Sequence, residues 1–142
     1  MIIPSRSFNR CLFLFLLLST PFQSFSQEEI QVKKFEFEKG KSSTVIKGKI
    51  KGYQTIDYVI NAKEGQTLDI KFTSSNSSNY FNLMAPGEDY VAFSNSSMDE
   101  NNFHGILEKS GDQKIRVYLM RSAARRNETA DFTLEISVKA GN

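Results

Sequence analysis

The feature that most constrains this chain is an alternation of apolar and polar residues over several short stretches. It is clearest at residues 115–119 and 132–138, and it recurs at 56–60 and 68–72. Because successive side chains of a strand point to opposite faces, this pattern is typical of antiparallel sheets with one buried face. We find no window with a sustained helical period, so the sequence predicts an all-β fold.

Further short stretches raise the expected number of strands to about eight. Turn signals separate them at intervals of roughly 8–12 residues, which favours a sandwich or a barrel. We place a hairpin turn at residues 63–66 between two of the alternating runs, with Gly65 supplying the positive φ. We expect residues 27–142 to form one domain, a single antiparallel β-sandwich. The additional candidate strands are 30–38, 43–51, 80–85, 90–94 and 103–107.

Residues 1–26 differ from the rest of the chain and match the layout of a cleavable secretory signal peptide. Two arginines precede an unbroken apolar run over residues 11–18, and two serines provide small residues before the expected cleavage site. This run is shorter than the roughly 20 residues that span a bilayer, so we expect no stable membrane anchoring. Cys11 stands at the start of the run, whereas a lipoprotein cysteine follows it. We expect cleavage after Ser26 and a periplasmic mature chain of residues 27–142.

Removal of this segment leaves the charges of the chain balanced. The full chain has 18 basic and 16 acidic residues, and the signal segment carries two of the bases. Nucleic-acid binding is excluded, because it requires many clustered Lys and Arg residues that neutralise phosphates. The mature chain has no cysteine, which excludes a disulfide framework and a thiolate metal site. The sequence predicts no cofactor and no metal, and it indicates no oligomeric state.

Few residues are candidates for catalysis. His104 is the only histidine, and a general base also needs a nucleophile and an orienting carboxylate, which the sequence does not identify. We therefore interpret His104 as a surface or edge residue, with a hydrolase that uses it as the alternative. The pairs Glu88-Asp89 and Asp99-Glu100 lack the alternating ligands of a calcium loop, and we interpret them as solvated charge. The sequence predicts that the protein is not an enzyme.

All four arginines of the mature chain fall within residues 116–126. Alternation places Arg116 and Tyr118 on the face opposite the buried aliphatic residues, so they point outward. Arginine pairs a carboxylate through two parallel hydrogen bonds, and Tyr and Arg are enriched at the energetic centres of interfaces. The alternative is that the arginines pair with Glu128, Asp131 or neighbouring strands of the same chain. The three arginines that continue into the following loop are Arg121, Arg125 and Arg126.

A second distinctive stretch is the Ser- and Asn-rich segment 74–79, which leads into Tyr80-Phe81-Asn82. Loops on a rigid sandwich often carry binding residues, and Ser, Asn and Tyr suit adaptable contacts. The alternative is an ordinary strand connection with Tyr80 or Phe81 in the core. Between Thr73 and Glu108 the chain contains no Lys or Arg, and acidic residues dominate its charge.

Three blocks of the sequence resemble the bacterial periplasmic inhibitors of g-type (goose-type) lysozyme. They run over residues 58–68, 75–82 and 116–126, and the pattern covers roughly residues 45–138. The first block is shared with secreted sandwiches that resemble pre-peptidase C-terminal domains. The resemblance implies a β-sandwich that blocks the peptidoglycan-binding cleft of a g-type lysozyme, its protein partner, with surface loops.

The resemblance also implies which residues contact the enzyme. A lysozyme needs a carboxylic acid in its cleft, and a guanidinium inserted there pairs that group and excludes substrate. We expect the inserted patch to be headed by Arg116, Tyr118 and Arg121. We expect rim charge or steering from Arg125 and Arg126, and we expect Tyr80 and Asn82 to support a second loop. The alternative function is a secreted sandwich that binds cell-envelope glycan or acts as a pre-peptidase C-terminal-like accessory domain.

Overall fold

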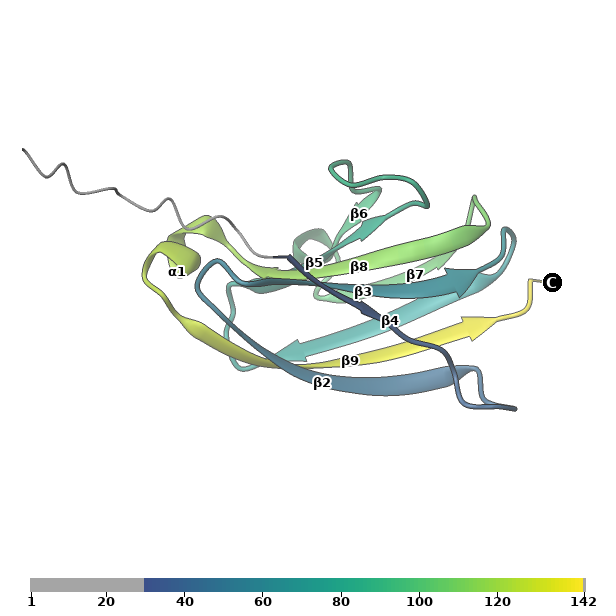
Figure 1. The fold of residues 1–142 in the computed structure, drawn as a ribbon, viewed down its shortest axis with the longest axis horizontal. Helices are drawn as coiled ribbons and strands as arrows, with labels where there is room; N and C mark the ends of the chain where they lie inside the picture. The colour runs from purple at the N-terminus through teal and green to yellow at the C-terminus, as the bar shows by residue number, and fades with distance from the viewer. Residues whose placement is uncertain (1–29, 142) are drawn as a thin grey trace, which may run out of the picture.

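The structure, a computed structural model, describes residues 30–141. Two sheets pack face to face as a β-sandwich (Figure 1). Sheet A has the strand order β1-β3-β8-β5-β6 and sheet B the order β2-β9-β4-β7. The expected signal peptide and its cleavage site lie outside the described residues. The elements are β1 (Ile30–Lys34), β2 (Ser43–Lys51), β3 (Thr55–Ala62), β4 (Thr67–Ser74), β5 (Asn79–Met84), β6 (Ser94–Asn95), η1 (Ser96–Met98), β7 (Asn102–Ile106), β8 (Gly111–Leu119), α1 (Arg121–Arg125) and β9 (Thr129–Lys139).

The core lies between the sheets and is centred on aromatic rings from both of them. Phe72 of sheet B packs against Phe81 of sheet A with ring centroids 5.6 Å apart, and against Phe132 at 5.7 Å. Tyr58 meets Phe132 edge to face at 6.2 Å. Alternating aliphatic residues of β3, β4, β8 and β9 fill the space around these rings. The predicted all-β sandwich is therefore confirmed.

One strand pair departs from the antiparallel arrangement that the sequence predicted. Strand β1 runs parallel to β3, so sheet A is mixed, while the other pairs in both sheets are antiparallel. A parallel pair needs a crossover between its strands. Here β2 provides it, because the chain crosses to sheet B and returns before β3 begins. Within residues 30–141, no helix has the length and apolar character needed to cross a membrane.

The predicted hairpin at residues 63–66 is wrong, although the turn itself is present. Strand β3 belongs to sheet A and β4 to sheet B, so this turn carries the chain across the sandwich. Gly65 has the expected positive φ, at 84°. Both strands bury one face in the same core, and alternation is identical whether two strands lie side by side or face each other. Every connection except that between β5 and β6 passes from one sheet to the other.

Two predicted strands are shorter in the structure. The strand expected at 30–38 ends at Lys34, yet Phe35 and Phe37 remain half-buried against the core and pack on each other at 6.2 Å. Their alternation therefore reflects packing outside a sheet. The strand expected at 90–94 is mostly loop, and only Ser94–Asn95 form the short β6.

Candidate functional site

Strand β8 presents two chemically different faces. Ile115, Val117 and Leu119 point into the core and are buried. Arg116 and Tyr118 lie half-buried on the outer face of sheet A. Because a one-residue slip would exchange these two sets, the register predicted for this strand is confirmed.

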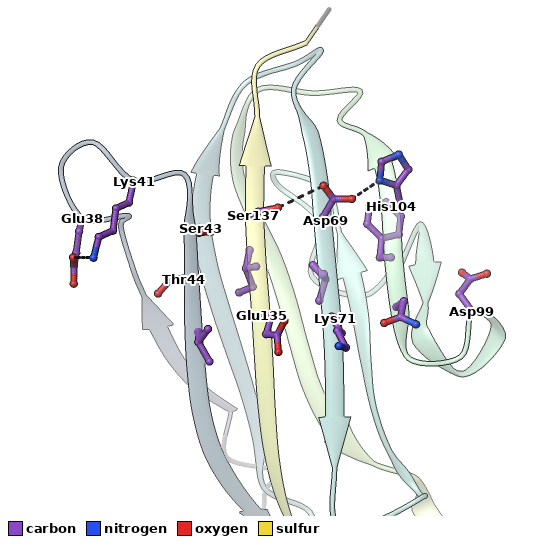
Figure 2. A pocket seen from close by; sticks show the side chains of 15 residues that line it. Glu38, Lys41, Ser43, Thr44, Asp69, Lys71, Asp99, His104, Glu135 and Ser137 are labelled. Atoms are coloured by element: carbon purple, nitrogen blue, oxygen red, sulfur yellow. Dashed lines mark hydrogen bonds and ion pairs between the residues drawn. The ribbon is translucent and has the colours of Figure 1, made fainter.

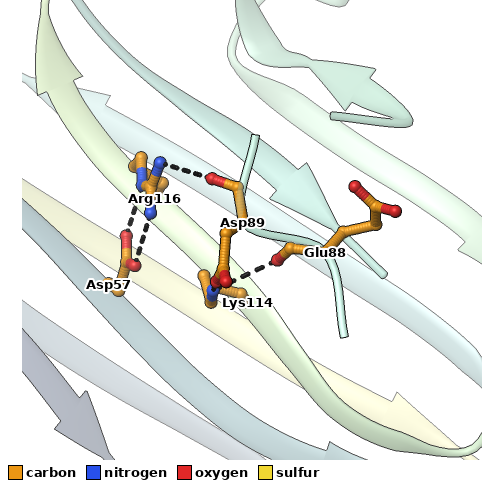
Figure 3. Close-up of polar contacts among 5 residues, drawn as sticks. All are labelled: Asp57, Glu88, Asp89, Lys114 and Arg116. Carbon is orange, nitrogen blue, oxygen red and sulfur yellow. Dashed lines mark hydrogen bonds and ion pairs between the residues drawn. The ribbon is translucent and has the colours of Figure 1, made fainter. Parts of the chain in front are cut away.

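The guanidinium of Arg116 is paired within the chain, to Asp57 on the neighbouring strand β3. Arg116 Nε donates to Asp57 Oδ1 at 2.7 Å, and Nη2 donates to Oδ2 at 2.8 Å (Figure 3). The two residues are direct cross-strand partners, and Asp57 is only 2% exposed. The hydrogen bonds that Arg116 donates to Asp57 raise the pKa of Arg116, although burial acts in the opposite direction. The alternative that an arginine pairs with a neighbouring strand therefore holds for Arg116.

A loop over residues 85–93 is tied to the outer face of sheet A by two cations of β8. Arg116 Nη1 donates to the Asp89 carbonyl at 3.0 Å. Lys114 pairs with the Asp89 carboxylate, and its Nζ donates to the Glu88 carbonyl at 3.1 Å (Figure 3). The hydrogen bond from Lys114 lowers the pKa of Asp89. Asp89 is exposed in this loop, as its interpretation as solvated charge predicted, and it also anchors the loop to β8.

The tyrosine of β8 belongs to a polar cluster on the same face. Asn95 Nδ2 donates to Tyr118 Oη at 3.0 Å and to Asn82 Oδ1 at 2.6 Å. In the pairing of β5 with β8, Tyr80 lies opposite Tyr118 and Asn82 lies opposite Arg116. The structure therefore brings four of the residues expected to contact lysozyme onto one face, with Tyr80 and Asn82 on β5, as the strand predicted over 80–85 indicated.

A shallow depression of about 210 Å³ lies beside this cluster. Its lining includes Asn82, Arg116 and Tyr118, together with Tyr53 from the β2–β3 turn. Tyr53 was not singled out from the sequence, because it lies in a turn far from the other three residues along the chain. Its aromatic ring adds to the apolar surface that Ile30 and Leu119 contribute to the lining.

The expected arginine loop is a short helix, α1, which follows β8 directly. Ala123 and Ala124 face the core and are buried, while all three arginines of the segment are exposed. A helix of five residues is too short to produce a helical period, so sequence patterning missed it. The two alanines fix which side of the helix faces solvent, and the arginines Arg121, Arg125 and Arg126 therefore project from a defined backbone.

The three arginines differ in their pairing. Arg126 Nε donates to Glu128 Oε2 at 2.6 Å, as the alternative of pairing within the chain anticipated. Asn76 also donates to Glu128. The hydrogen bond from Asn76, and to a smaller extent that from Arg126, lowers the pKa of Glu128. Within residues 30–141, neither Arg121 nor Arg125 has an ion-pair partner.

The Ser- and Asn-rich segment 74–79 supports this helix. The buried Asn79 side chain donates to the Tyr118 carbonyl at 2.9 Å, and Ser74 Oγ donates to Asn79 Oδ1 at 2.8 Å. The backbone N–H of Met120 donates to the Ser78 carbonyl at 2.9 Å. Many of the polar groups expected to make adaptable contacts are therefore used to hold the end of β8 and the start of α1. The aromatic residue of the following strand that enters the core is Phe81.

An open groove of about 1180 Å³ lies on the outer face of sheet B (Figure 2). Its lining mixes Lys41 and Lys71 with Glu135 and Asp69, and the half-buried Phe103 adds apolar surface. Sequence analysis did not find this groove, because it is assembled from four strands and the connection before β2.

His104 lies at the edge of this groove on β7, the edge strand of sheet B, with its side chain 77% exposed. Its Nδ1 contacts the Asp69 carboxylate, and Ser137 Oγ donates to Asp69 Oδ2 at 3.5 Å (Figure 2). The hydrogen bond with His104 lowers the pKa of Asp69. A catalytic triad needs the histidine between the serine and the carboxylate, whereas here the carboxylate lies between the other two. The interpretation of His104 as an edge residue is confirmed.

In the part of the chain that the structure describes, no group of three or more His, Cys, Asp or Glu side chains is placed to hold a metal ion. The other acidic pair, Asp99-Glu100, is exposed in the turn before β7.

Comparison with known proteins relates the chain to lysozyme inhibitors. A protein of Escherichia coli (strain K12) described as an inhibitor of g-type lysozyme is 35% identical over 131 residues, which is 90% of this chain and 92% of that protein. The crystal structure of Aeromonas hydrophila PliG, described as a periplasmic inhibitor of g-type lysozyme, is 36% identical with a TM-score of 0.73. The match covers 78% of this chain and 98% of the Aeromonas hydrophila chain.

A more distant likeness concerns the fold alone. The pre-peptidase C-terminal domain of a collagenase from Bacillus anthracis has a TM-score of 0.50 at 22% identity, over 80% of this chain and 97% of that domain. No family model matches the chain. The identity to the Escherichia coli protein extends over nearly the whole of both chains, so this chain belongs to the PliG family of g-type lysozyme inhibitors.

Proposed function

We propose that this protein is a periplasmic inhibitor of g-type lysozyme that covers the cleft of the enzyme with helix α1 and the outer face of sheet A. Its relatives support the target and the compartment, since the Aeromonas hydrophila protein is described as periplasmic and both are described as inhibitors of g-type lysozyme. The charged, apolar and small-residue layout of residues 1–26 supports export through a cleavable signal.

The observation that carries the proposed surface is the exposure of Arg121 and Arg125 on an anchored helix. Neither has an ion-pair partner within residues 30–141, and the buried Ala123 and Ala124 hold the helix in place. Because α1 is fixed before binding, little backbone entropy is lost when these side chains meet a partner. Both arginines are therefore available to pair with a carboxylate of another protein.

The chemistry of a lysozyme explains how such an arginine inhibits it. The enzyme requires a protonated carboxylic acid that donates its proton to the leaving group. A guanidinium placed against that carboxyl group favours its charged form and lowers its pKa, so the acid loses its proton before it can act. The guanidinium, held by two parallel hydrogen bonds, also occupies the space of the sugar that is to be cleaved. We place Arg121 in this role, with Arg125 beside it.

The other residues of the surface have supporting roles. Tyr118, Tyr80 and Asn82 form a rigid platform next to α1, on which tyrosine rings provide apolar contact at low entropic cost. Arg126 contributes charge at the rim, partly neutralised by Glu128. Arg116 acts as a positioning residue, because its guanidinium holds Asp57 and the loop over residues 85–93.

The experiment that tests this proposal is a cell-wall lysis assay with purified residues 27–142. The protein is added to g-type, c-type and i-type lysozymes at equal activity. We expect inhibition of the g-type enzyme at stoichiometric concentrations and weaker or no inhibition of the other two. Full activity of the g-type enzyme in the presence of excess folded protein would contradict the proposal.

The groove on sheet B is the observation that favours the second function, binding of envelope glycan. It is open, and its lining mixes charged side chains with apolar ones such as Val45 and Phe103. Glycan sites usually present exposed aromatic platforms, and the chain has no Trp. Co-sedimentation with insoluble peptidoglycan separates the two functions, since a glycan binder pellets without lysozyme and an inhibitor stays in the supernatant.

A further inference from the structure

Glu128 lies between helix α1 and strand β9, and its backbone closes the C-terminal end of the helix. Asn127 N–H donates to the Ala124 carbonyl at 2.9 Å, and Glu128 N–H donates to the Ala123 carbonyl at 3.1 Å. Asn127 has a left-handed backbone, with φ of 56°. Two such bonds around a left-handed residue form a Schellman motif, which satisfies the last carbonyls of a helix. The position of Glu128 is therefore fixed relative to α1.

The carboxylate of Glu128 binds a second part of the proposed surface, the Ser- and Asn-rich segment 74–79. Asn76 Nδ2 donates to Glu128 Oε1 at 3.0 Å, and to the carbonyl of the residue that follows Glu128 at 3.1 Å. In the same segment, the Ser78 carbonyl accepts the N–H of Met120, the residue before α1. The segment therefore holds the start of the helix through Ser78 and its end through Asn76.

The backbone carbonyl of Glu128 binds a third part, the turn between β2 and β3, which lies at the same end of the sandwich as α1 (Figure 1). It accepts a hydrogen bond from Gly52 N–H at 2.9 Å. Gly52 has φ of 58°, and a Cβ at this position would lie 2.7 Å from Asn127 Oδ1. Glycine therefore allows the turn to approach the end of the helix. The next residue of the turn is Tyr53, which lines the depression beside Tyr118.

The charge of Glu128 does not favour the proposed target. Its second carboxylate oxygen accepts a hydrogen bond from Arg126 Nε at 2.6 Å, so it neutralises one of the cations beside α1. A surface that is to bind a carboxyl group of an enzyme gains from positive charge, and an acid at this place reduces it. The contacts of Glu128 with the helix, with segment 74–79 and with the turn of Tyr53 supply a different role for this residue.

We infer that Glu128 is a positioning residue of the inhibitor, which holds α1, segment 74–79 and the turn of Tyr53 in the one arrangement that meets the lysozyme. This inference rests on the proposed inhibition of g-type lysozyme. Glu128 itself need not touch the enzyme. It raises the affinity because a partner binds only the fraction of molecules in which the parts of the surface are already in place.

The variant Glu128→Ala separates positioning from charge, because the two predict changes of opposite sign. Removal of an acid beside α1 makes the surface more basic, so charge alone predicts equal or stronger inhibition. Positioning predicts weaker inhibition, since the hydrogen bonds to the carboxylate are lost and the competent fraction falls. We expect the inhibition constant against a g-type lysozyme to rise about tenfold.

Two further variants serve as controls. Glu135→Ala removes the same charge from an exposed site farther along β9, on the outer face of sheet B, and should leave the inhibition constant within about twofold of the wild-type value. Glu128→Gln keeps a side-chain oxygen that accepts the hydrogen bond from Asn76, but it loses the negative charge. Positioning through Asn76 therefore predicts that Glu128→Gln retains most of the inhibition that Glu128→Ala loses.

Hydrogen exchange of the amides of residues 121–128 measures the positioning directly. Exchange should be faster in Glu128→Ala than in the wild type and should be unchanged in Glu135→Ala, while melting curves show that each variant is folded. Inhibition by folded Glu128→Ala that equals or exceeds that of the wild type would overturn the inference. Equal losses in Glu128→Ala and Glu128→Gln would also overturn it, because the charge and not the acceptor for Asn76 would then matter. If Glu128→Ala does not fold, Asn76→Ala takes its place, and wild-type inhibition by that folded variant has the same consequence.

The same measurements distinguish this inference from the proposed function. If the wild type inhibits and Arg121→Ala weakens inhibition while Glu128→Ala does not, only the positioning role of Glu128 is refuted. If the folded wild type does not inhibit a g-type lysozyme at all, the proposed function and the positioning role both fail.

Discussion

Arg116 lies directly opposite Asp57 in the pairing of β8 with β3, and its guanidinium binds both carboxylate oxygens, at 2.7 and 2.8 Å. Both side chains are largely buried, at 18% and 3% exposed. The guanidinium of this outward-facing arginine is therefore engaged within the chain, and removal of either partner would leave a buried charge unpaired. The same guanidinium also donates to the Asp89 carbonyl, so this ion pair also fixes the position of the loop over residues 85–93.

Removal of one partner of this pair is expected to be strongly destabilising. Arg116→Ala leaves Asp57 buried and unpaired, which costs about 3–5 kcal/mol of unfolding free energy. Lys34→Ala removes a pair with Asp112 that is exposed on both sides, and it should cost much less, because solvent screens exposed ion pairs. Urea unfolding at pH 7 measures both changes. Equal losses of unfolding free energy in the two variants would show that Asp57 does not need its partner more than an exposed carboxylate does.

The register of β8 makes a second prediction. Val117 is fully buried between the outward Arg116 and Tyr118, so Val117→Asp places an unpaired charge in the core. The expected cost is several kcal/mol, which is on the order of the whole stability of a small domain. Circular dichroism should show an unfolded or much less stable variant at room temperature. A melting temperature within a few degrees of the wild type would mean that the register is wrong.

The free energy of unfolding should depend on pH, because the Asp69 carboxylate is paired in the folded protein. The pKa of Asp69 is lowered in the folded protein from the ordinary value of 3.8, first by its hydrogen bond with His104. A depressed carboxyl pKa contributes stability that is present above 3.8 and is lost as the pH falls through the folded value. The free energy of unfolding of the wild type should therefore fall below about pH 4.

Asp69→Asn isolates this contribution. The variant should be less stable than the wild type at pH 7 and should lose stability less steeply between pH 4 and pH 2. Urea unfolding at a series of pH values measures the slope. Parallel curves for the two proteins would contradict the assigned role of the Asp69–His104 contact.

The alternation in the sequence was sufficient to predict the strands, their buried faces and the sandwich. It did not determine which strands are neighbours, as the turn around Gly65 shows, because an amphipathic strand satisfies the same core from either sheet. It also overestimated the extent of β1, because Phe35 and Phe37 alternate while packing outside the sheet. Local periodicity records burial, and strand pairing depends on contacts between distant residues.

The candidate site was predictable to a similar extent. Clustering of the arginines and the outward position of Tyr118 were visible in the sequence. The pairing of Arg116 with Asp57 was not, because it joins strands that are far apart along the chain. Helix α1 was missed because five residues do not establish a helical period, and Tyr53 was missed because a turn carries no periodicity at all.

Arg126 provides a test of rim charge. It is exposed and partly neutralised by Glu128, so Arg126→Ala should mainly slow association with lysozyme and reduce the salt dependence of that rate. Stopped-flow or surface plasmon resonance measurements at two salt concentrations separate the rates. Lys33→Ala, which removes an exposed charge from the edge strand β1, is the control. An effect of Arg126→Ala confined to the dissociation rate would place Arg126 inside the cleft.

A conservative substitution at position 121 tests whether the planar geometry of the arginine side chain matters in addition to its charge. Arg121→Lys keeps the charge but loses the planar fork, so it should lose much of the inhibition if the guanidinium binds a carboxylate through two parallel hydrogen bonds. The comparison of Arg121→Lys with Arg121→Ala in a lysis assay checks this. Wild-type inhibition by Arg121→Lys would show that a point charge is sufficient.

The most direct test of the inhibitory surface is the inhibition constant of Arg121→Ala/Arg125→Ala against a g-type lysozyme. Both side chains are exposed and have no ion-pair partner within residues 30–141, so the variant should melt close to the wild type. If these arginines pair with a desolvated carboxyl group, the loss is about 2–5 kcal/mol, which weakens inhibition about 30-fold or more. An inhibition constant of the folded variant within twofold of the wild-type value would contradict the account.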